Sequence, residues 1–308
     1  MPPAFRKFAW FFVAYLVAVI LFGAWVRISG AGAGCGDHWP MCNGEVIPRE
    51  PGTKTIIEFV HRLTSGLSGI LGLVLLGWAW RRERNGPVFR AAAAMMLFLL
   101  LEAFIGAVLV KKRLVVDDAS VNRAVVIAIH LTNTLLLTAW ATIMAWRATW
   151  RPAGGHHAAG NRWLVTVTLI ALVVTNTTGA ITALGDTLFP TQPTIGTGLF
   201  AKISEDLSAG QHFLVQLRMV HPVIAGTVAL FIIGAFAALR RRWTSDLVKQ
   251  LLGWTLVLVA VQVVLGIVNI ALAAPGWMQI IHLLLAQLLW ITAVAAWLAM
   301  KPATPVNA

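Results

Sequence analysis

Long, uninterrupted runs of apolar residues separated by short polar stretches dominate this chain. Each run reaches the ~20 residues that a helix needs to cross a bilayer. Because the runs are continuous, they do not match the alternating apolar and polar positions of membrane-barrel strands. The pattern predicts eight membrane-spanning helices, which we place at residues 8–27, 57–80, 89–110, 122–146, 162–184, 213–239, 247–271 and 277–300.

Composition supports lipid as the solvent of these helices. Of the 308 residues, 58% are hydrophobic and only 12% are charged, whereas soluble domains carry roughly 25% charged residues. The first run follows Arg6 and Lys7, as in a secretory signal. However, about 20 apolar residues exceed the length of a signal-peptide core. We therefore expect residues 1–34 to be retained, with the first run as a membrane span.

The net charge of +12 is confined to one side of the predicted membrane. With the N-terminus inside, the cytoplasmic segments hold two acidic residues, Glu83 and Asp246, and 14 basic ones. The 14 basic residues are Arg6, Lys7, Arg81, Arg82, Arg84, Arg90, Arg147, Arg151, Arg162, Arg240, Arg241, Arg242, Lys249 and Lys301. Cytoplasmic enrichment of Lys and Arg predicts that both termini are cytoplasmic. The lipid bilayer explains the charge excess, and we expect no nucleic-acid partner.

An internal repeat relates the two halves of the chain. A shift of 160 residues lays "HRLTSGLSGI", from His61, on "HPVIAGTVAL", from His221, and a shift of 152 pairs His130 with His282. A looser match joins "GAWVRISGAG" after the first span to "GAITALGD" after the fifth. Because each half has an even number of spans, the two repeats are parallel.

The repeat predicts the architecture. We expect an all-α integral membrane protein in which eight transmembrane helices form two parallel pseudo-symmetric four-helix bundles. The N-terminal half is residues 1–150, a cytoplasmic linker covers 151–161, and the C-terminal half is 162–308.

Four histidines, His61, His130, His221 and His282, occupy equivalent places near the outer ends of the even-numbered spans. A single intramembrane histidine often makes only an interhelical hydrogen bond. Four at equivalent positions point instead to two haems, each held by two imidazoles across a bundle. Zinc or copper is less favoured, because no soft ligands cluster at that depth.

The two halves differ three residues before these histidines. Glu58 precedes His61, whereas Arg218 precedes His221 and Gln279 precedes His282. Residues at this spacing share a helix face. A carboxylate beside a haem can handle protons, whereas a guanidinium there can pair with a haem propionate. This asymmetry predicts one site for chemistry and one for electron transfer, although Glu58 could instead form an ion pair with Arg62.

Other polar residues of the spans and loops leave alternatives open. Glu102 and Gln262 are equivalent in the repeat, and we expect a structural hydrogen bond for each. Cys35 and Cys42 lie in the first outer loop, where a disulfide persists. Their spacing matches neither CxxC nor CxxCH, so either a structural disulfide or a redox-active pair is compatible with the sequence.

The sequence resembles the haem A synthase family over nearly all eight spans. The segments that carry the resemblance are "GAWVRISGAGAGCGDHWPMCNG", "EFVHRLTSG", "IHLTNT", "HPVIAG" and "IHLLLAQ". The resemblance implies oxidation of the C8 methyl of haem O to a formyl group, through two successive hydroxylations and loss of water. Cys35 and Cys42 match the outer-loop pair of one bacterial branch, which implies a bacterial inner membrane.

The resemblance also implies residue roles. His61 and His130 would form the haem O substrate site, with Glu58 as the catalytic acid residue. His221 and His282 would be the iron ligands of a haem b cofactor. A haem O synthase and an electron-transfer protein are the expected partners, and the apolar helix faces would permit a homo-oligomer.

Three other functions compete with this hypothesis. A dihaem cytochrome b that only moves electrons explains four histidines equally well, but not the presence of Glu58 in one half alone. A haem transporter would need a path for haem and no oxidation of the porphyrin. A purely structural membrane subunit gives the repeated histidines no purpose.

Overall fold

The apolar runs form helices that extend beyond the runs into polar residues. The computed structural model describes residues 1–150, 162–191, 208 and 210–300; the predicted linker, 151–161, lies outside them. The helices are α1 (Pro3–Ile28), α2 (Thr53–Arg82), α3 (Pro87–Lys111), α4 (Val121–Thr149), α5 (Arg162–Leu188), α7 (Phe213–Leu217), α8 (Val220–Arg242), α9 (Asp246–Ala271) and α10 (Gly276–Ala299).

Eight segments of the described chain are long and apolar enough to cross a membrane, with α7 and α8 together forming the sixth. No strand occurs among the described residues. Large apolar side chains such as Phe104, Leu230 and Ile267 are exposed on the outer helix faces, where lipid would solvate them. The structure confirms the predicted all-α, multi-pass membrane fold.

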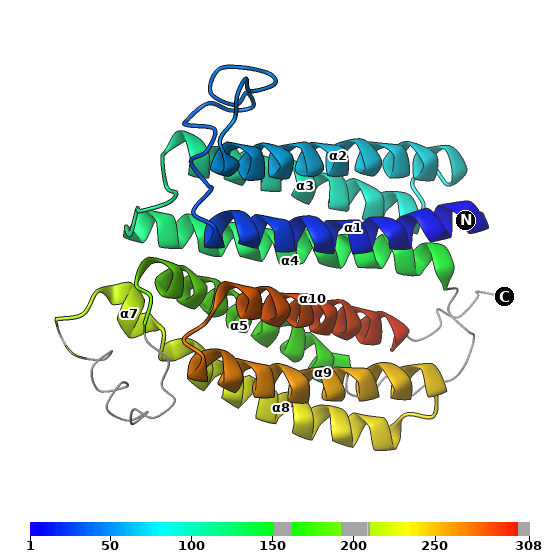
Figure 1. Ribbon diagram of the computed structural model, residues 1–308. Coiled ribbons are helices and arrows are strands. Elements are labelled where there is room, and N and C mark those ends of the chain that lie inside the picture. Colours follow the sequence, from blue (N-terminus) through cyan, green and yellow to red (C-terminus); the bar gives the residue numbers. More distant parts are fainter. Residues whose placement is uncertain (151–161, 192–207, 209, 301–308) are drawn as a thin grey trace.

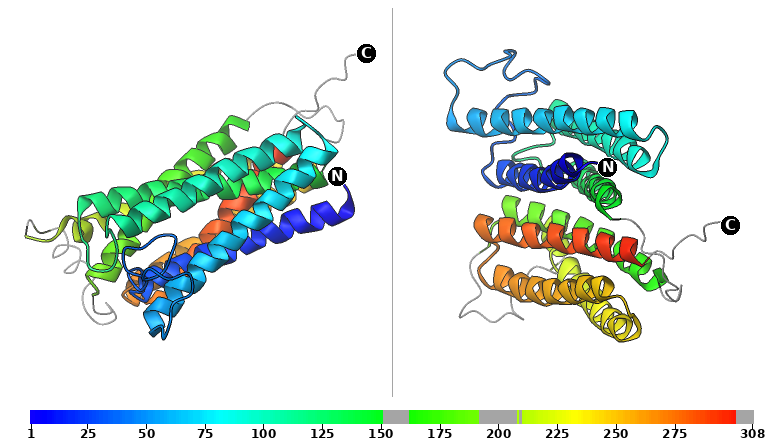
Figure 2. Two further views of the ribbon diagram at one scale, coloured as in Figure 1. Left: turned by 90° about the horizontal axis from the view of Figure 1, so that it is seen from above. Right: turned by 90° about the vertical axis from the view of Figure 1, so that its right-hand side faces the viewer.

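The helices gather in two groups of four crossings. α1–α4 lie together on one side of the molecule, and α5 and α8–α10 lie on the other (Figures 1 and 2). Each group has its own apolar core, around Phe12 and Met95 in the first and around Phe236 and Leu252 in the second. α4 packs against α5 and α10 between the groups. There the Trp290 indole N–H donates a hydrogen bond to the Leu135 carbonyl oxygen, at 2.8 Å.

The sixth crossing is broken, contrary to the continuous helix predicted over 213–239. α7 ends at Leu217, and α8 begins at Val220. The cause is Pro222, which has no N–H to bond to the carbonyl of Arg218 and whose ring crowds that carbonyl. The equivalent position in α2 is Arg62, and α2 continues without a break. The backbone therefore turns just before His221.

The connections at the two ends of the molecule differ. α1 begins and α10 ends on the same side, as expected for an even number of crossings (Figure 1). On that side α2 is joined to α3 by the short turn 83–86. On the opposite side, residues 29–52 form a long loop that projects beyond the start of α2. We call this segment the outer loop.

Candidate functional site

The four repeated histidines come from the four even-numbered crossings, α2, α4, α8 and α10. His61 and His130 belong to the first group, and His221 and His282 belong to the second. Within each group the two imidazoles lie close enough to interact electrostatically. All four side chains are half-buried. The structure thus brings together the two pairs that the sequence predicts.

Glycines of neighbouring helices lie against three of these rings. A Cβ atom on Gly23 of α1 would lie 3.1 Å from Cε1 of His61, and one on Gly179 of α5 would lie 3.0 Å from Cε1 of His221. A Cβ on Gly266 of α9 would lie 3.3 Å from Cε1 of His282. At these distances the histidine ring would have to shift by a few tenths of an ångström to admit a side chain. Gly23 and Gly179 are the first residues of the loosely matched "GA" segments, a signal that could have identified them in the sequence.

Hydrogen bonds define the tautomer of His221. The Thr178 hydroxyl donates to the Thr175 carbonyl at 2.9 Å, and its oxygen lies 3.2 Å from Nδ1 of His221. With the hydroxyl proton directed at the Thr175 carbonyl, Nδ1 donates to this oxygen. In that tautomer Nε2 carries the lone pair and can ligate a metal.

His282 is held in the same tautomer by a different partner. The amide nitrogen of Gln262 lies 3.2 Å from Nε2 of His282 and also donates to the His282 carbonyl, at 3.1 Å. An amide nitrogen only donates, so Nε2 accepts and carries the lone pair. Iron binding at this nitrogen would exchange the amide for the metal. The sequence predicts a hydrogen bond from Gln262 but not its histidine partner.

Glu102 lies behind His130 in the first group. One carboxylate oxygen is 3.5 Å from Nδ1 of His130, and the carboxylate accepts hydrogen bonds from the Asn133 amide, at 2.6 Å, and from the Thr134 hydroxyl. A carboxylate behind a histidine is a common way to orient a metal-ligating ring. Glu102 thus makes the predicted structural hydrogen bonds, to Asn133 and Thr134, and its carboxylate also lies beside the His130 ring.

The surroundings of the histidine rings fit a haem. Among the described residues, Nδ1 of His61, His130 and His282 meets no hydrogen-bond partner, so these rings are not held in a closed hydrogen-bond network. His61 instead has the edge of the Phe22 ring against it, with ring centroids 5.6 Å apart. Paired, half-buried imidazoles with rings against glycine backbone suit a flat ligand bound through two axial nitrogens.

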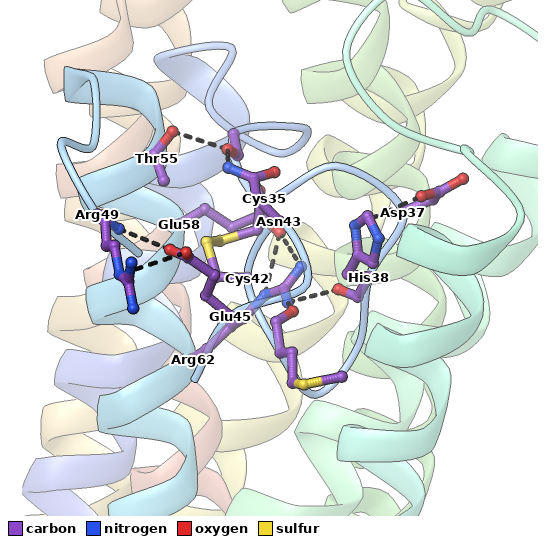
Figure 3. The surroundings of a disulfide bond; sticks show 12 residues. Cys35, Asp37, His38, Cys42, Asn43, Glu45, Arg49, Thr55, Glu58 and Arg62 are labelled. Atoms are coloured by element: carbon purple, nitrogen blue, oxygen red, sulfur yellow. Dashed lines mark hydrogen bonds and ion pairs between the residues drawn. A yellow bond between two sulfur atoms is a disulfide. The ribbon is translucent and has the colours of Figure 1, made fainter. Parts of the chain in front are cut away.

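Glu58 is buried where α2 meets the outer loop (Figure 3). One carboxylate oxygen accepts a hydrogen bond from the Cys35 backbone N–H, at 2.9 Å. The other accepts from the Arg62 guanidinium, one helical turn later. Only 4% of the Glu58 side chain and 14% of the Arg62 side chain are exposed. The ion pair considered from the sequence is present, and it leaves the carboxylate fixed from two sides.

The same arginine holds the outer loop. Arg62 Nη1 donates to the carbonyl oxygens of His38 and Met41, both at 2.7 Å. The Thr55 hydroxyl donates to the Gly34 carbonyl at 2.8 Å. A Cβ on Gly34 would lie 2.4 Å from the Lys54 carbonyl oxygen, so only glycine permits this approach. The loop therefore rests directly on the first turns of α2.

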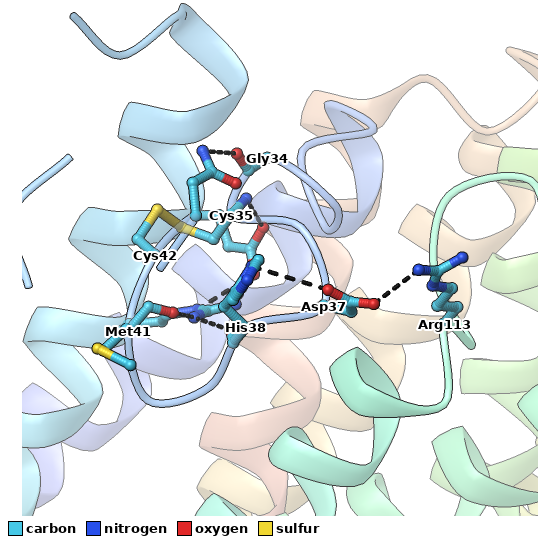
Figure 4. A network of polar contacts seen from close by, with 10 residues as sticks. Gly34, Cys35, Asp37, His38, Met41, Cys42 and Arg113 are labelled. Atoms are coloured by element: carbon cyan, nitrogen blue, oxygen red, sulfur yellow. Dashed lines mark hydrogen bonds and ion pairs between the residues drawn. A yellow bond between two sulfur atoms is a disulfide. The ribbon is translucent and has the colours of Figure 1, made fainter. Parts of the chain in front are cut away.

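Cys35 and Cys42 form a disulfide inside this loop, which confirms the predicted pairing (Figures 3 and 4). Both cysteines are buried. The Cys35 N–H that bonds to Glu58 thus belongs to a residue of the disulfide. Closing so short a loop stabilises the fold by about 2–2.5 kcal/mol in the chain-entropy description.

A surface ion pair anchors the other side of the loop. Arg113, which follows α3, donates to the Asp37 carboxylate at 2.6 Å (Figure 4). This hydrogen bond and the positive charge lower the pKa of Asp37 below its usual value. The Asp37 carboxylate in turn raises the pKa of Arg113. Asp37 also lies 3.7 Å from Nδ1 of His38.

Arg218, predicted beside His221, is buried against the end of α5. Its guanidinium lies 3.0 Å from the Asp186 carboxylate and donates to the carbonyl oxygens of Gly185, at 2.8 Å, and Phe189. A haem propionate at this guanidinium would have to share it with these partners or replace one of them.

Comparison with known proteins places the chain in a family. A sequence model for COX15-CtaA, described as cytochrome oxidase assembly protein, matches residues 6–294. The chain belongs to the COX15-CtaA family. This agrees with the resemblance found in the sequence.

This COX15-CtaA chain is similar to proteins of two different names. Two proteins, from two strains of Thermus thermophilus, are named protoheme IX farnesyltransferase; each is 43% identical over 289 residues, which is 92% of this chain and 46% of the relative. The chain thus spans about half the length of these relatives. A heme A synthase of Shouchella clausii is 41% identical over 86 residues, 28% of this chain and 29% of the relative. A heme A synthase of Geobacillus kaustophilus is 42% identical over 106 residues, 33% of each chain.

Proposed function

We propose that this protein is a haem A synthase, which oxidises the C8 methyl of haem O to a formyl group. The observation that carries the proposal is the asymmetry between two otherwise equivalent histidine sites. A buried carboxylate, Glu58, lies one turn before His61, whereas Arg218 occupies the equivalent place before His221. Membership of the COX15-CtaA family and the similarity to heme A synthases support this assignment.

The N-terminal half, residues 1–150, is proposed to hold the substrate. His61 and His130 would bind the iron of haem O, and the partly exposed rings leave a route for a ligand that must enter and leave. The carboxylate behind His130 and the glycine against His61 would set the orientation of the two rings. Entry from the lipid suits a farnesyl tail, because each buried CH₂ contributes about 0.8 kcal/mol.

Glu58 is proposed to act on the methyl group during oxidation. Two successive hydroxylations convert the methyl to a gem-diol, which loses water to leave the formyl group. In each hydroxylation the carbon would lose one proton and two electrons, which pass to the expected electron-transfer protein, and water would then add to the cationic carbon and lose a second proton to leave the hydroxyl group. Arg62 and the Cys35 N–H fix both carboxylate oxygens, so that Glu58 can take up a proton or stabilise positive charge at the carbon without moving.

The C-terminal half, residues 162–308, is proposed to hold the resident cofactor. His221 and His282 would hold the iron of a haem b through Nε2 of their imidazoles. A bis-histidine haem supplies one-electron transfer when bound. Arg218, paired with Asp186, is the proposed contact for a propionate.

The Thermus relatives support a haem O synthase as the partner. Their name denotes transfer of a farnesyl group to protohaem, yet this chain matches less than half of their length. A farnesyl-transferring activity located in the unmatched part would place both steps in one polypeptide. The product of the first step is too apolar to diffuse through water, so direct transfer between the two proteins is expected.

The test is to analyse the pigments of the full chain purified from cells that make haem O. Acid-extracted pigments would be separated by chromatography with mass detection, for the wild type, Glu58→Gln and Glu45→Gln. Glu45 is a partly exposed acid of the same outer loop that contacts Arg49, and it serves as the control. We expect haem A with the wild type and Glu45→Gln, and haem O or a hydroxylated intermediate with Glu58→Gln.

Other outcomes of this test identify the competing functions. Haem b alone in all three chains would overturn the synthase proposal in favour of an electron-transferring cytochrome b. New haem O formed from protohaem, in cells without another farnesyl transferase, would assign to this chain the activity named for the Thermus relatives.

A further inference from the structure

One arginine of the first helix group forms hydrogen bonds with the second group. Arg27 lies in the last turn of α1, near the outer end. Its Nη1 donates to the Ala183 carbonyl of α5, at 2.7 Å, and to the Thr187 hydroxyl. Its Nη2 donates to the side-chain oxygen of Gln279 in α10, at 3.0 Å. The guanidinium thus joins two helices of the second group at this end.

The second group has no arginine at the position equivalent to Arg27 in the repeat. The match that pairs Gly23 with Gly179 also pairs Arg27 with Ala183. Ala183 has no polar side chain, and it receives the Arg27 hydrogen bond through its carbonyl. The pseudo-symmetry is therefore broken at this point in one direction, from the N-terminal half to the C-terminal half.

The residues that Arg27 contacts are close in the structure to both C-terminal histidines. Gln279 lies one turn before His282, and its amide also donates to the Ala274 carbonyl, at 2.8 Å, which fixes the start of α10. The end of α5 that accepts from Arg27 also carries Asp186. Asp186 interacts electrostatically with Arg27 and pairs with Arg218, three residues before His221.

The charges in this cluster do not cancel. Arg27, Arg218 and Arg123, which also interacts electrostatically with Arg27, contribute three positive charges, whereas Asp186 contributes one negative charge. A buried net positive charge favours the more negative state of a nearby group. For a haem, that state is the reduced form, so a positive charge raises its reduction potential.

We infer that Arg27 is a positioning residue of the C-terminal site, supplied by the N-terminal half. Its charge and its contact with Gln279 set the reduction potential of a haem held by His221 and His282. The C-terminal site is then incomplete without the N-terminal half, and residues from both halves adjust the electron transfer between them. This inference rests on the part of the proposed function that puts a haem in the C-terminal half.

The test is a redox titration of the full chain followed by the optical bands of the low-spin haem. A His61→Ala background removes one axial ligand of the N-terminal site, so that the remaining bis-histidine signal comes from the C-terminal site. Arg27→Gln removes the charge. Arg113→Gln is the control, because Arg113 is an exposed arginine of the same end that pairs with Asp37.

We expect Arg27→Gln to shift the midpoint to a lower potential and Arg113→Gln to leave it unchanged. Equal midpoints in the two variants would overturn the inference. If Arg27→Gln retains no haem, Gln279→Leu decides, since it removes the Arg27–Gln279 contact but keeps the positive charge. A wild-type electron paramagnetic resonance spectrum in Gln279→Leu would overturn the positioning role of Arg27. A His61→Ala chain without any haem would overturn the proposed function and this inference together, whereas the other outcomes leave the proposed function intact.

Discussion

At the scale of single residues, Arg62 decides how the outer loop meets α2. It contacts Glu58 on its own helix and two backbone carbonyls of the loop. Glu58 in turn accepts from the Cys35 N–H. The predicted catalytic carboxylate, the disulfide and the arginine are therefore one unit, and a change in any of them acts on the other two.

Removing Arg62 should destabilise the protein strongly. Arg62→Met leaves Glu58 buried without its countercharge, which costs about 3–5 kcal/mol when a buried pair loses one partner. Arg49→Met is the matched control, because Arg49 also pairs with an acid four residues away but is 89% exposed, and such pairs contribute roughly 0–1 kcal/mol. Thermal unfolding in detergent measures both. Similar losses in the two variants would contradict the buried unit described here.

The Asp37–Arg113 pair should show a dependence on pH. Because Arg113 lowers the pKa of Asp37, the contribution of the pair to stability is present above the usual value of ~3.9. It is lost as the pH falls through the lower folded-state value. Carbon NMR of the Asp37 carboxyl should give a titration midpoint below ~3.9 in the wild type. Arg113→Gln should move it upward, and an unchanged midpoint would argue against the pair.

The sequence reveals some of these residues and not others. The histidines, Glu58 and the cysteines stand out because an imidazole, a carboxylate or a thiol is conspicuous in or beside an apolar run. Gly34 and Arg27 do not stand out, because their importance depends on a segment distant in the chain that approaches in space. The sequence alone does not show which distant segments lie close together in the folded chain.

At the scale of helices, glycines set how closely α1 and α5 approach the histidine-bearing helices. Gly23 lies against the ring of His61 and Gly179 against the ring of His221, so an added Cβ would crowd that ring. Gly66 and Gly226 lie just over one turn further along α2 and α8, and a Cβ added to either would have no neighbouring atom within 4 Å. The repeat contains both pairs of glycines, but only the first pair touches a histidine.

A larger residue at Gly179 should therefore displace His221. Gly179→Val adds volume to a packed contact, which costs about 1–3 kcal/mol and corresponds to roughly a 5- to 150-fold loss of haem affinity. Gly226→Val lies on the same helix as His221, in open space, and should retain the haem. The ratio of haem to protein after purification compares them. Equal retention would refute the proposed packing role of Gly179.

The helices themselves are the most predictable level of this structure. Continuous apolar runs locate all eight crossings, because only helices satisfy the backbone of such runs in lipid. The ends of the runs do not coincide with the ends of the helices, since α2 begins at Thr53, in residues that can be solvated by water. The break before α8 follows from Pro222, whose effect on the carbonyl of Arg218 could have been inferred from "HPVIAG".

At the scale of the whole molecule, the charge distribution predicts which side of the membrane each end occupies. Val46, in the outer loop, is 78% exposed, and Asn85 lies in the turn between α2 and α3. Since the two native cysteines form a disulfide, a single new cysteine can be labelled selectively. An impermeant maleimide should label Val46→Cys in intact cells and Asn85→Cys only after permeabilisation. The reverse result would invert the proposed orientation.

Two structurally equivalent halves are proposed to hold haems with different roles. The most direct measurement is the identity of the pigments retained when each half is disabled in cells that make haem O. His61→Ala with His130→Ala should leave haem b alone, and His221→Ala with His282→Ala should leave haem O that is not converted to haem A. The same mixture of pigments in both double variants would contradict the division of roles between the halves.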